Sequence, residues 1–114
     1  MGRLKMKLDQ ITFKAIHWEQ IPPIKHLGEH GYALWRTQQF NNVRVRIVQY
    51  SAGYLAELWC LKGHLIFCLE GEVHTELEDS ATFTLTSGMS YQVTHHAEAH
   101  RSSTLTSAKL FIVD

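Results

Sequence analysis

Apolar side chains occupy every second position in several short segments of this 114-residue chain. Val43, Val45 and Ile47 form such a row and alternate with a partly charged row, which is the pattern of a half-buried β-strand. Further candidate strands are 65–69, 73–77, 81–86, 91–93, 102–106 and 109–113. Many short strands separated by turns indicate an all-β sandwich or barrel, because closure hides the edges that an open sheet would expose.

Local turn and helix signals add two details to this prediction. Gly71 follows the apolar run 65–69, and we predict a tight hairpin there because glycine tolerates the positive φ angle that short reversals need. Residues 15–21 carry a faint helical pattern, which predicts about one turn of helix before Pro22 and Pro23 end it. The rest of the pattern is that of strands and turns.

The length of the chain is that of one domain, on the usual basis of ~100 to 200 residues per domain. Hydrophobic residues make up 45% of the chain and aromatic residues 11%, which is enough for a real core. The first forty residues are less regular than the rest. We therefore predict a single domain over 1–114, with an irregular N-terminal arm over 1–40 and a barrel over 41–114.

Charge and hydropathy exclude several classes of partner. Eleven Lys and Arg residues balance eleven Asp and Glu residues, so no net field attracts nucleic acid or an anionic membrane surface. No segment approaches the ~20 apolar residues of a membrane span, and the first residues do not resemble a signal peptide. We expect a cytoplasmic protein in which Cys60 and Cys68 are free thiols, because that compartment is reducing.

Two segments resemble a known family. Residues 63–72 read Gly-His-Leu-Ile-Phe-Cys-Leu-Glu-Gly-Glu and resemble the first half of the cupin signature, and residues 87–100 resemble the second half. Further segments between Trp35 and Asp114 are similar to the small single-domain proteins called DHCW-motif cupins, and the likeness covers about residues 18–114. The resemblance implies a double-stranded β-helix, which is a jelly-roll barrel, with a metal or ligand site inside its wider end.

The resemblance also implies a set of metal ligands. Counting back from Gly71, His64 takes the position of the Glu of the cupin signature, Cys60 that of its second His and Leu58 that of its first His. His100 takes the position of the closing histidine. Because residues two apart on a strand share a face, Leu58 and Cys60 are expected on the same side of the chain. Leu58 cannot bind a metal ion, so the ligand set is Cys60, His64 and His100.

A thiolate with two neutral imidazoles suits Zn²⁺, or Fe, Ni or Cu, and leaves at least one coordination position open. Each residue also has a simpler interpretation. Free cysteine is often buried as core packing, which applies to Cys60 and still more to Cys68. His64 and His100 would have to be paired, metal-bound or neutral inside an apolar barrel, because burying an unpaired charge is costly.

Other residues are weaker candidates. His95 and His96 are expected on an exposed loop, with contact to a substrate as the alternative. Glu98 is expected to be hydrated, with a general base as the alternative. The arginines Arg44 and Arg46 are expected on a paired surface or at an interface rather than in a binding site.

Three functions follow from these residues, and the sequence leaves open whether the protein catalyses a reaction. The first is a metal-dependent enzyme that acts on a small molecule. The second is a non-catalytic cupin that binds a small-molecule ligand, and the third is a degenerate cupin that lost its metal when Leu58 replaced a ligand. Leu65, Phe67 and Leu69 form an apolar row that a lone barrel would expose, so we also predict a homodimer.

Overall fold

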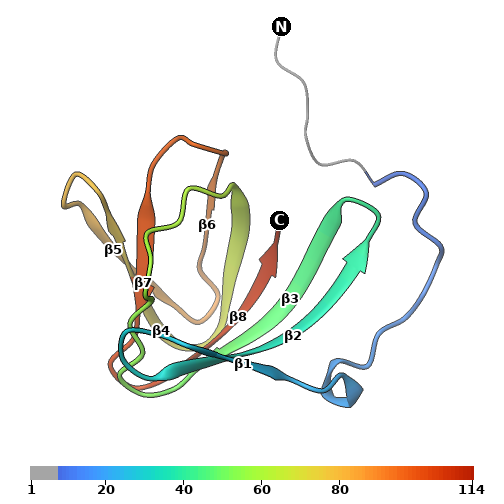
Figure 1. Ribbon diagram of the computed structural model, residues 1–114, viewed down its shortest axis with the longest axis horizontal. Helices are drawn as coiled ribbons and strands as arrows, with labels where there is room; N and C mark the ends of the chain where they lie inside the picture. Colours follow the sequence, from blue (N-terminus) through green and yellow to red (C-terminus); the bar gives the residue numbers. More distant parts are fainter. Residues whose placement is uncertain (1–7) are drawn as a thin grey trace, which may run out of the picture.

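The structure is a computed structural model that describes residues 8–114. Its elements are a 3₁₀ helix, η1 (Trp18–Gln20), and the strands β1 (Ile24–Leu27), β2 (Tyr32–Phe40), β3 (Val43–Tyr50), β4 (His64–Leu77), β5 (Thr82–Thr86), β6 (Ser90–Val93), β7 (His100–Ser103) and β8 (Ala108–Val113). Figure 1 shows strands throughout the folded body, so the all-β prediction is confirmed. Among the described residues, no helix is long and apolar enough to cross a membrane. The cytoplasmic location stays a prediction.

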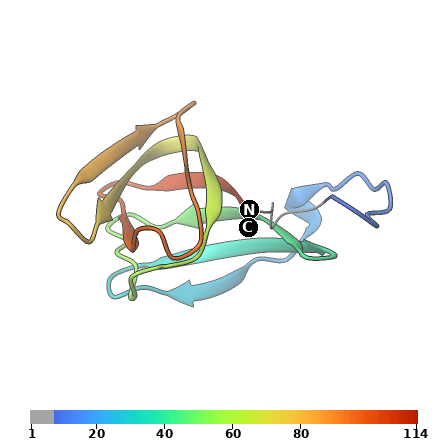
Figure 2. The same ribbon diagram turned by 90° about the horizontal axis from the view of Figure 1, so that it is seen from above.

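All strand pairs are antiparallel, and β4 is the strand that joins the two sheets. The strand order is β1-β2-β3-β8-β4-β5, and β6 and β7 also pair with β4. The first half of β4 pairs with β6 and β8, whereas the second half pairs with β5 and β7. Figure 2 shows the resulting curvature, in which β4 turns from one sheet into the other and the strands surround an interior.

The predicted hairpin at Gly71 is wrong, because β4 continues through this residue. Between Cys68 and Glu70 the register against β8 shifts, which marks a β-bulge. Gly71 has φ of +78°, and a Cβ atom there would meet the carbonyl oxygen of Ser107 and lie 3.0 Å from Cα of Ala108. The chain bends at Gly71 and passes close to another part of the backbone, and both features need a glycine. A tight turn needs a glycine for the same reason, which is the positive φ angle.

The predicted irregular arm over 1–40 is too long. Residues 24–40 contain β1 and β2, and β2 pairs with β3 from Ala33 opposite Tyr50 to Phe40 opposite Val43. Polar residues interrupt the hydrophobic alternation in β2, so pairing with β3 rather than local pattern decides its conformation. The short helical turn predicted over 15–21 is present as η1.

The core lies between the two sheets and is built from alternate residues of β3, β4 and β8. Its fully buried side chains include Val48, Cys68, Val73 and Leu110. Both cysteines are free, as predicted, and Cys68 is a packing residue. On the outer face, Leu65 and Phe67 are exposed. The structure describes one chain, so the homodimer stays a prediction.

We expect Gly71→Ala to lower the free energy of unfolding by about 3 kcal/mol, because it combines a strained backbone with a clash against Ser107. Gly53 is a matched control, since it has φ of +75° but a Cβ atom added there would meet nothing within 4 Å. Gly53→Ala should cost only about 1 kcal/mol. Urea unfolding of the two variants measures the difference. Equal losses would show that the close approach at Gly71 does not exist.

Candidate metal centre

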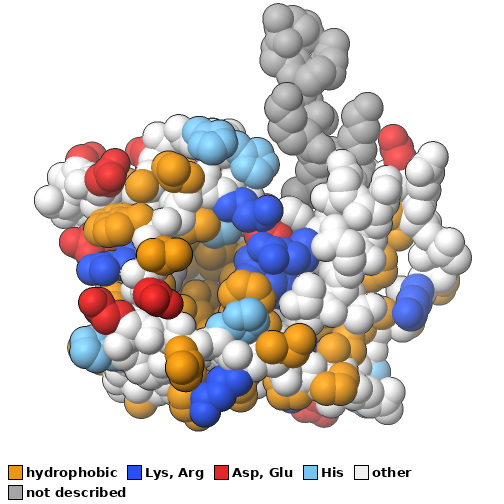
Figure 3. Space-filling model, viewed as in Figure 1, with side chains coloured by type: hydrophobic (Ala, Val, Ile, Leu, Met, Phe, Trp, Pro, Cys, Tyr) orange, Lys and Arg blue, Asp and Glu red, His pale blue; other side chains and the backbone are white. Residues whose placement is uncertain are grey.

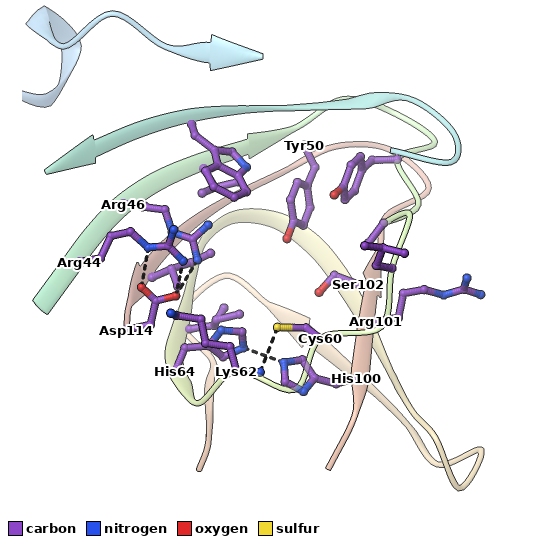
Figure 4. Close-up of a pocket in the computed structure, with 17 residues that line it drawn as sticks. Arg44, Arg46, Tyr50, Cys60, Lys62, His64, His100, Arg101, Ser102 and Asp114 are labelled. Carbon is purple, nitrogen blue, oxygen red and sulfur yellow. Dashed lines mark hydrogen bonds and ion pairs between the residues drawn. The ribbon is translucent and has the colours of Figure 1, made fainter. Parts of the chain in front are cut away.

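A cavity of about 190 Å³ opens into the interior of the barrel (Figure 4). Its walls come from β2, β3, β4, β7, β8 and the segment 54–62 that precedes β4. Within 54–66, every second residue lines the cavity, from Tyr54 to Ile66. Leu58 and Cys60 therefore share a side, as the spacing predicts. Leu58 lies at the rim, where 76% of its surface is exposed.

Backbone pairing places Cys60 directly opposite His100. The N–H of Cys60 donates to the carbonyl oxygen of His100 at 2.8 Å, and the N–H of His100 donates to the carbonyl of Cys60 at 3.0 Å. Cys60 lies outside the named strands, so this isolated bridge holds it at the start of β7. The local sequence gives no indication of this pairing, which joins residues forty positions apart.

The curvature of β4 brings His64 to the same point. His64 begins β4, whereas His100 pairs with Leu77 at the other end of that strand. A straight strand of this length would separate its ends by roughly 43 Å at ~3.3 Å per residue. Yet Nε2 of His64 lies 2.9 Å from Nε2 of His100. The site exists because the strand closes round the barrel.

The three predicted ligands form one cluster. One ligand atom from each of Cys60, His64 and His100 lies within 4.8 Å of the others, and Figure 4 shows the three side chains pointing toward one another. Ligand atoms of a tetrahedral zinc ion lie roughly 3.4 to 3.6 Å apart at the usual bond lengths. Binding would therefore move these atoms by about 1 Å. The sequence-based prediction that the trio converges is confirmed by the geometry, whereas metal binding itself stays a prediction.

The hydrogen bond at Nδ1 of His100 suits a metal ligand, whereas Nδ1 of His64 lacks such a bond. Nδ1 of His100 lies 2.9 Å from the carbonyl oxygen of Glu98, which can only accept, so Nδ1 carries the proton. In the neutral ring Nε2 then carries the lone pair, as in many metal-binding histidines, and it lies 2.9 Å from Nε2 of His64. Nδ1 of His64 is buried and has no partner among the described residues. The side chain of Glu98, by contrast, is exposed and does not enter the site.

The electrostatic environment favours the metal-binding forms of Cys60 and His64. A hydrogen bond with His100 lowers the pKa of the Cys60 thiol and raises the pKa of His100. Burial, with a smaller contribution from the charge of His100, lowers the pKa of His64 to about 4. The thiolate and the neutral imidazole are the forms that bind transition metals.

His95 and His96 are both exposed, as predicted, and neither contributes to the cavity lining. Nδ1 of His95 instead accepts a hydrogen bond of 3.0 Å from the N–H of Gly63. This bond fixes the turn that leads into β4 and thus supports the position of His64. His95 therefore contacts the turn before β4 rather than the cavity.

The chain resembles solved structures of cupin type at low sequence identity. A RmlC-like cupin from Shewanella frigidimarina NCIMB 400 matches over 91% of both chains, with a TM-score of 0.73 and 20% identity. An ectoine synthase from P. lautus matches over 89% of this chain and 76% of its own, with a TM-score of 0.72 and 20% identity. A predicted oxalate decarboxylase from Thermotoga maritima matches over 88% of this chain and 96% of its own, with a TM-score of 0.75 and 13% identity.

The chain has a cupin fold. The jelly-roll barrel implied by the sequence resemblance is confirmed, and at these identities the likeness extends to the fold alone. No protein-family model and no curated protein sequence matches the chain. The narrower similarity to DHCW-motif cupins stays a prediction.

The cupin cavity also contains an ion-pair cluster that the sequence analysis missed. Arg44 donates to both carboxylate oxygens of Asp114 at 2.8 Å, and Arg46 donates to one of them at 3.0 Å. The side chain of Asp114 is fully buried and only 6% of Arg46 is exposed. The expectation of a surface or interface position is therefore wrong for Arg46. The Arg-x-Arg spacing does put both guanidinium groups on one strand face, but the sequence does not show that this face lines the cavity.

Arg44 and Asp114 stabilise each other's charged form, whereas burial lowers the pKa of Arg46. Burial disfavours the charged form of Asp114, but hydrogen bonds from Arg44 and the positive charges of both arginines outweigh it, and the pKa of Asp114 is lowered. The hydrogen bond to Asp114 also raises the pKa of Arg44. The indole of Trp35 covers the Arg46 guanidinium, with 4.3 Å between the carbon Cζ and the ring centroid. Arg46 is thus held in one orientation.

The low pKa of His64 predicts acid sensitivity of the metal-free protein. An unfolded histidine has a pKa near ~6.5, so between pH 6.5 and pH 4 the unfolded state binds more protons than the folded state. The contribution of neutral His64 to the free energy of unfolding is therefore present above pH 6.5 and is lost as the pH falls from 6.5 to 4. Each unit between the two pKa values is worth about 1.4 kcal/mol, so we expect a loss of about 2 to 3 kcal/mol.

Urea unfolding at several pH values, after treatment with a chelator, measures this loss. His64→Asn should flatten the dependence between pH 6.5 and pH 4. His30→Asn is the control, because His30 is an exposed histidine outside the cavity, and it should leave the slope unchanged. If the His64→Asn variant keeps the pH dependence of the wild type, the acid sensitivity does not come from His64.

Asp114→Asn should destabilise the protein by about 3 to 5 kcal/mol, because it leaves the buried charge of Arg46 without a counter-charge. The matched control is Glu76→Gln, which breaks a partly exposed ion pair with Arg101. It should cost less than about 1 kcal/mol. Thermal and urea unfolding of both variants provide the comparison, and a loss of similar size in both would contradict the buried position of Asp114.

Proposed function

We propose that this cupin-fold protein binds one transition metal ion through Sγ of Cys60, Nε2 of His64 and Nε2 of His100, and that a small molecule enters the cavity beside it. The observation that carries the proposal is the convergence of the three ligand atoms within 4.8 Å from separate parts of the chain. The hydrogen bond from His100 to the carbonyl of Glu98 supports it, because it places the lone pair of the neutral ring on Nε2.

The donor set determines which metals fit. One soft sulfur and two imidazole nitrogens suit Zn²⁺ and also Fe, Ni or Cu, whereas Ca²⁺ and Mg²⁺ prefer oxygen ligands. Leu58 supplies no fourth ligand, so a position faces the cavity and is open to water or to a ligand oxygen. A metal ion with an open position polarises a bound oxygen and lowers the pKa of bound water. The proposal extends to binding of the metal and the small molecule, and assigns no reaction.

A metal-free cupin that binds a small molecule is the second candidate. The observation in its favour is Leu58, which occupies the rim at the position where the sequence resemblance implies a ligand. In that case the imidazole pair and Cys60 would act as hydrogen-bonding groups. The two candidates differ in one measurable property, which is the metal content of the purified protein.

Elemental analysis of protein purified without a nickel column tests the proposal. We expect about one equivalent of transition metal per chain, or stoichiometric uptake of Zn²⁺ after dialysis. With Co²⁺ in place of the native metal, a thiolate-to-cobalt charge-transfer band should appear. Cys60→Ala should abolish that band, and His100→Ala should reduce metal binding at least ten-fold.

Cys68→Ala is the control for these variants, because Cys68 is fully buried in the core and lies outside the cavity lining. It should lower stability without changing the metal content. A wild-type protein that takes up none of Zn²⁺, Fe²⁺, Ni²⁺ and Cu²⁺ would overturn the proposal. So would a Cys60→Ala variant that keeps the charge-transfer band.

A further inference from the structure

A buried hydrogen-bond donor in the cavity has no acceptor. Nε of Arg46 has no partner among the described residues, although only 6% of the residue is exposed. The Nη2 end of the same guanidinium is bound to Asp114, and Trp35 covers its face. A buried donor without an acceptor costs about 1 to 3 kcal/mol, so such groups in a cavity lining indicate a missing ligand atom. A carboxylate oxygen is one acceptor that would satisfy this donor.

The cationic groups around this donor outnumber the carboxylates. Arg44, Arg46 and Lys62 line one side of the cavity together with Asp114, which is the one acidic residue that the described part of the chain contributes to the lining. Figure 4 shows these four side chains gathered on one side, and Figure 3 shows Lys and Arg side chains beside a hollow with an apolar interior. Arg101 points away from them and pairs with acidic residues outside the cavity. Even with Cys60 as a thiolate, positive charge remains in excess by one, which favours an anionic ligand.

The rest of the cavity limits the size and nature of the ligand. An engineered protein cavity of ~150 Å³ binds benzene, so a cavity of about 190 Å³ takes a molecule of roughly six to eight non-hydrogen atoms. Val48, Ile66 and Ile112 contribute apolar wall, which suits a short hydrocarbon portion. One free N–H beside an existing carboxylate suits a singly charged group better than a dianion, because Asp114 would repel a second negative charge.

We propose that the cavity recognises a small organic carboxylate of about six to eight non-hydrogen atoms, whose carboxylate accepts a hydrogen bond from Nε of Arg46 and lies near the ammonium group of Lys62. The cluster of Cys60, His64 and His100 lines the same cavity, so the remainder of the ligand reaches the proposed metal position. This last feature rests on the proposed function. Recognition of the carboxylate does not rest on the proposed function, because Arg46 and Lys62 line the cavity whether or not a metal is bound.

Matched pairs of probes test the proposal. Pentanoate and butanoate are compared with pentanamide and butanamide, which have the same size and no charge. Isothermal titration and thermal unfolding are measured at constant ionic strength, on chelator-treated protein and on Zn²⁺-loaded protein. We expect each carboxylate to bind at least ten-fold more tightly than its amide in both preparations. Inorganic phosphate is the comparison for the other anion class and should bind more weakly than pentanoate.

Two variants and one control assign the binding to these residues. Arg46→Lys removes the Nε donor and should weaken pentanoate binding at least ten-fold, with the amide unchanged. Lys62→Gln should weaken it at least three-fold. Because Lys62 is exposed, this variant keeps the test valid if Arg46→Lys fails to fold. Lys14→Gln, which changes an exposed lysine outside the cavity, should bind pentanoate as the wild type does.

The outcomes separate this inference from the proposed metal site. If carboxylates bind the chelator-treated protein and Lys62→Gln weakens this binding, the inference holds even where the protein takes up no metal. If the protein takes up metal but amides bind as tightly as carboxylates, the inference is overturned and the metal site stands. Tighter binding of phosphate than of pentanoate would also overturn it, as would wild-type affinity in the Lys62 variant.

Discussion

The bend of β4 at Gly71 is the constraint on which the rest of the structure depends. One strand pairs with β6 and β8 before the bend and with β5 and β7 after it, so the two sheets share a single backbone. The start of β4 and the strand paired with its other end, β7, thereby line one cavity. His64 starts the strand, and His100 pairs with its last residue, yet their Nε2 atoms are 2.9 Å apart. The glycine is needed because the backbone at Ser107 leaves no space for a Cβ atom.

The cavity combines two kinds of chemistry that are usually opposed. Cys60, His64 and His100 offer soft and neutral donors that attract a metal cation. Across the same space, Arg44 and Arg46 are cationic and are balanced in part by Asp114. The buried carboxylate is what allows two guanidinium groups to remain charged beside a metal-binding cluster, because it offsets their mutual repulsion. A ligand with a negative end and a neutral end would satisfy both sides.

Sequence reasoning recovered the strands with clear alternation and the three candidate ligands, and its errors have identifiable causes. Gly71 was interpreted as a turn because a hairpin and a bulge both require a glycine with positive φ. The strand β2 was missed because its polar residues hide the alternation, and its partner β3 supplies the missing stabilisation. Arg46 was placed on a surface because arginine is rarely buried, and its partner Asp114 lies 68 positions away.

The sequence by itself determined that the protein is all-β, that Cys60 and Leu58 share a side, and that Cys68 is a core residue. These properties follow from the two-residue period of a strand and from composition, both of which are local. The tertiary structure alone decided which face of β3 lines the cavity, that Cys60 pairs with His100, and that Asp114 neutralises the arginines. Those contacts join distant segments, and their energies depend on how the sheets close rather than on the residues adjacent in the chain.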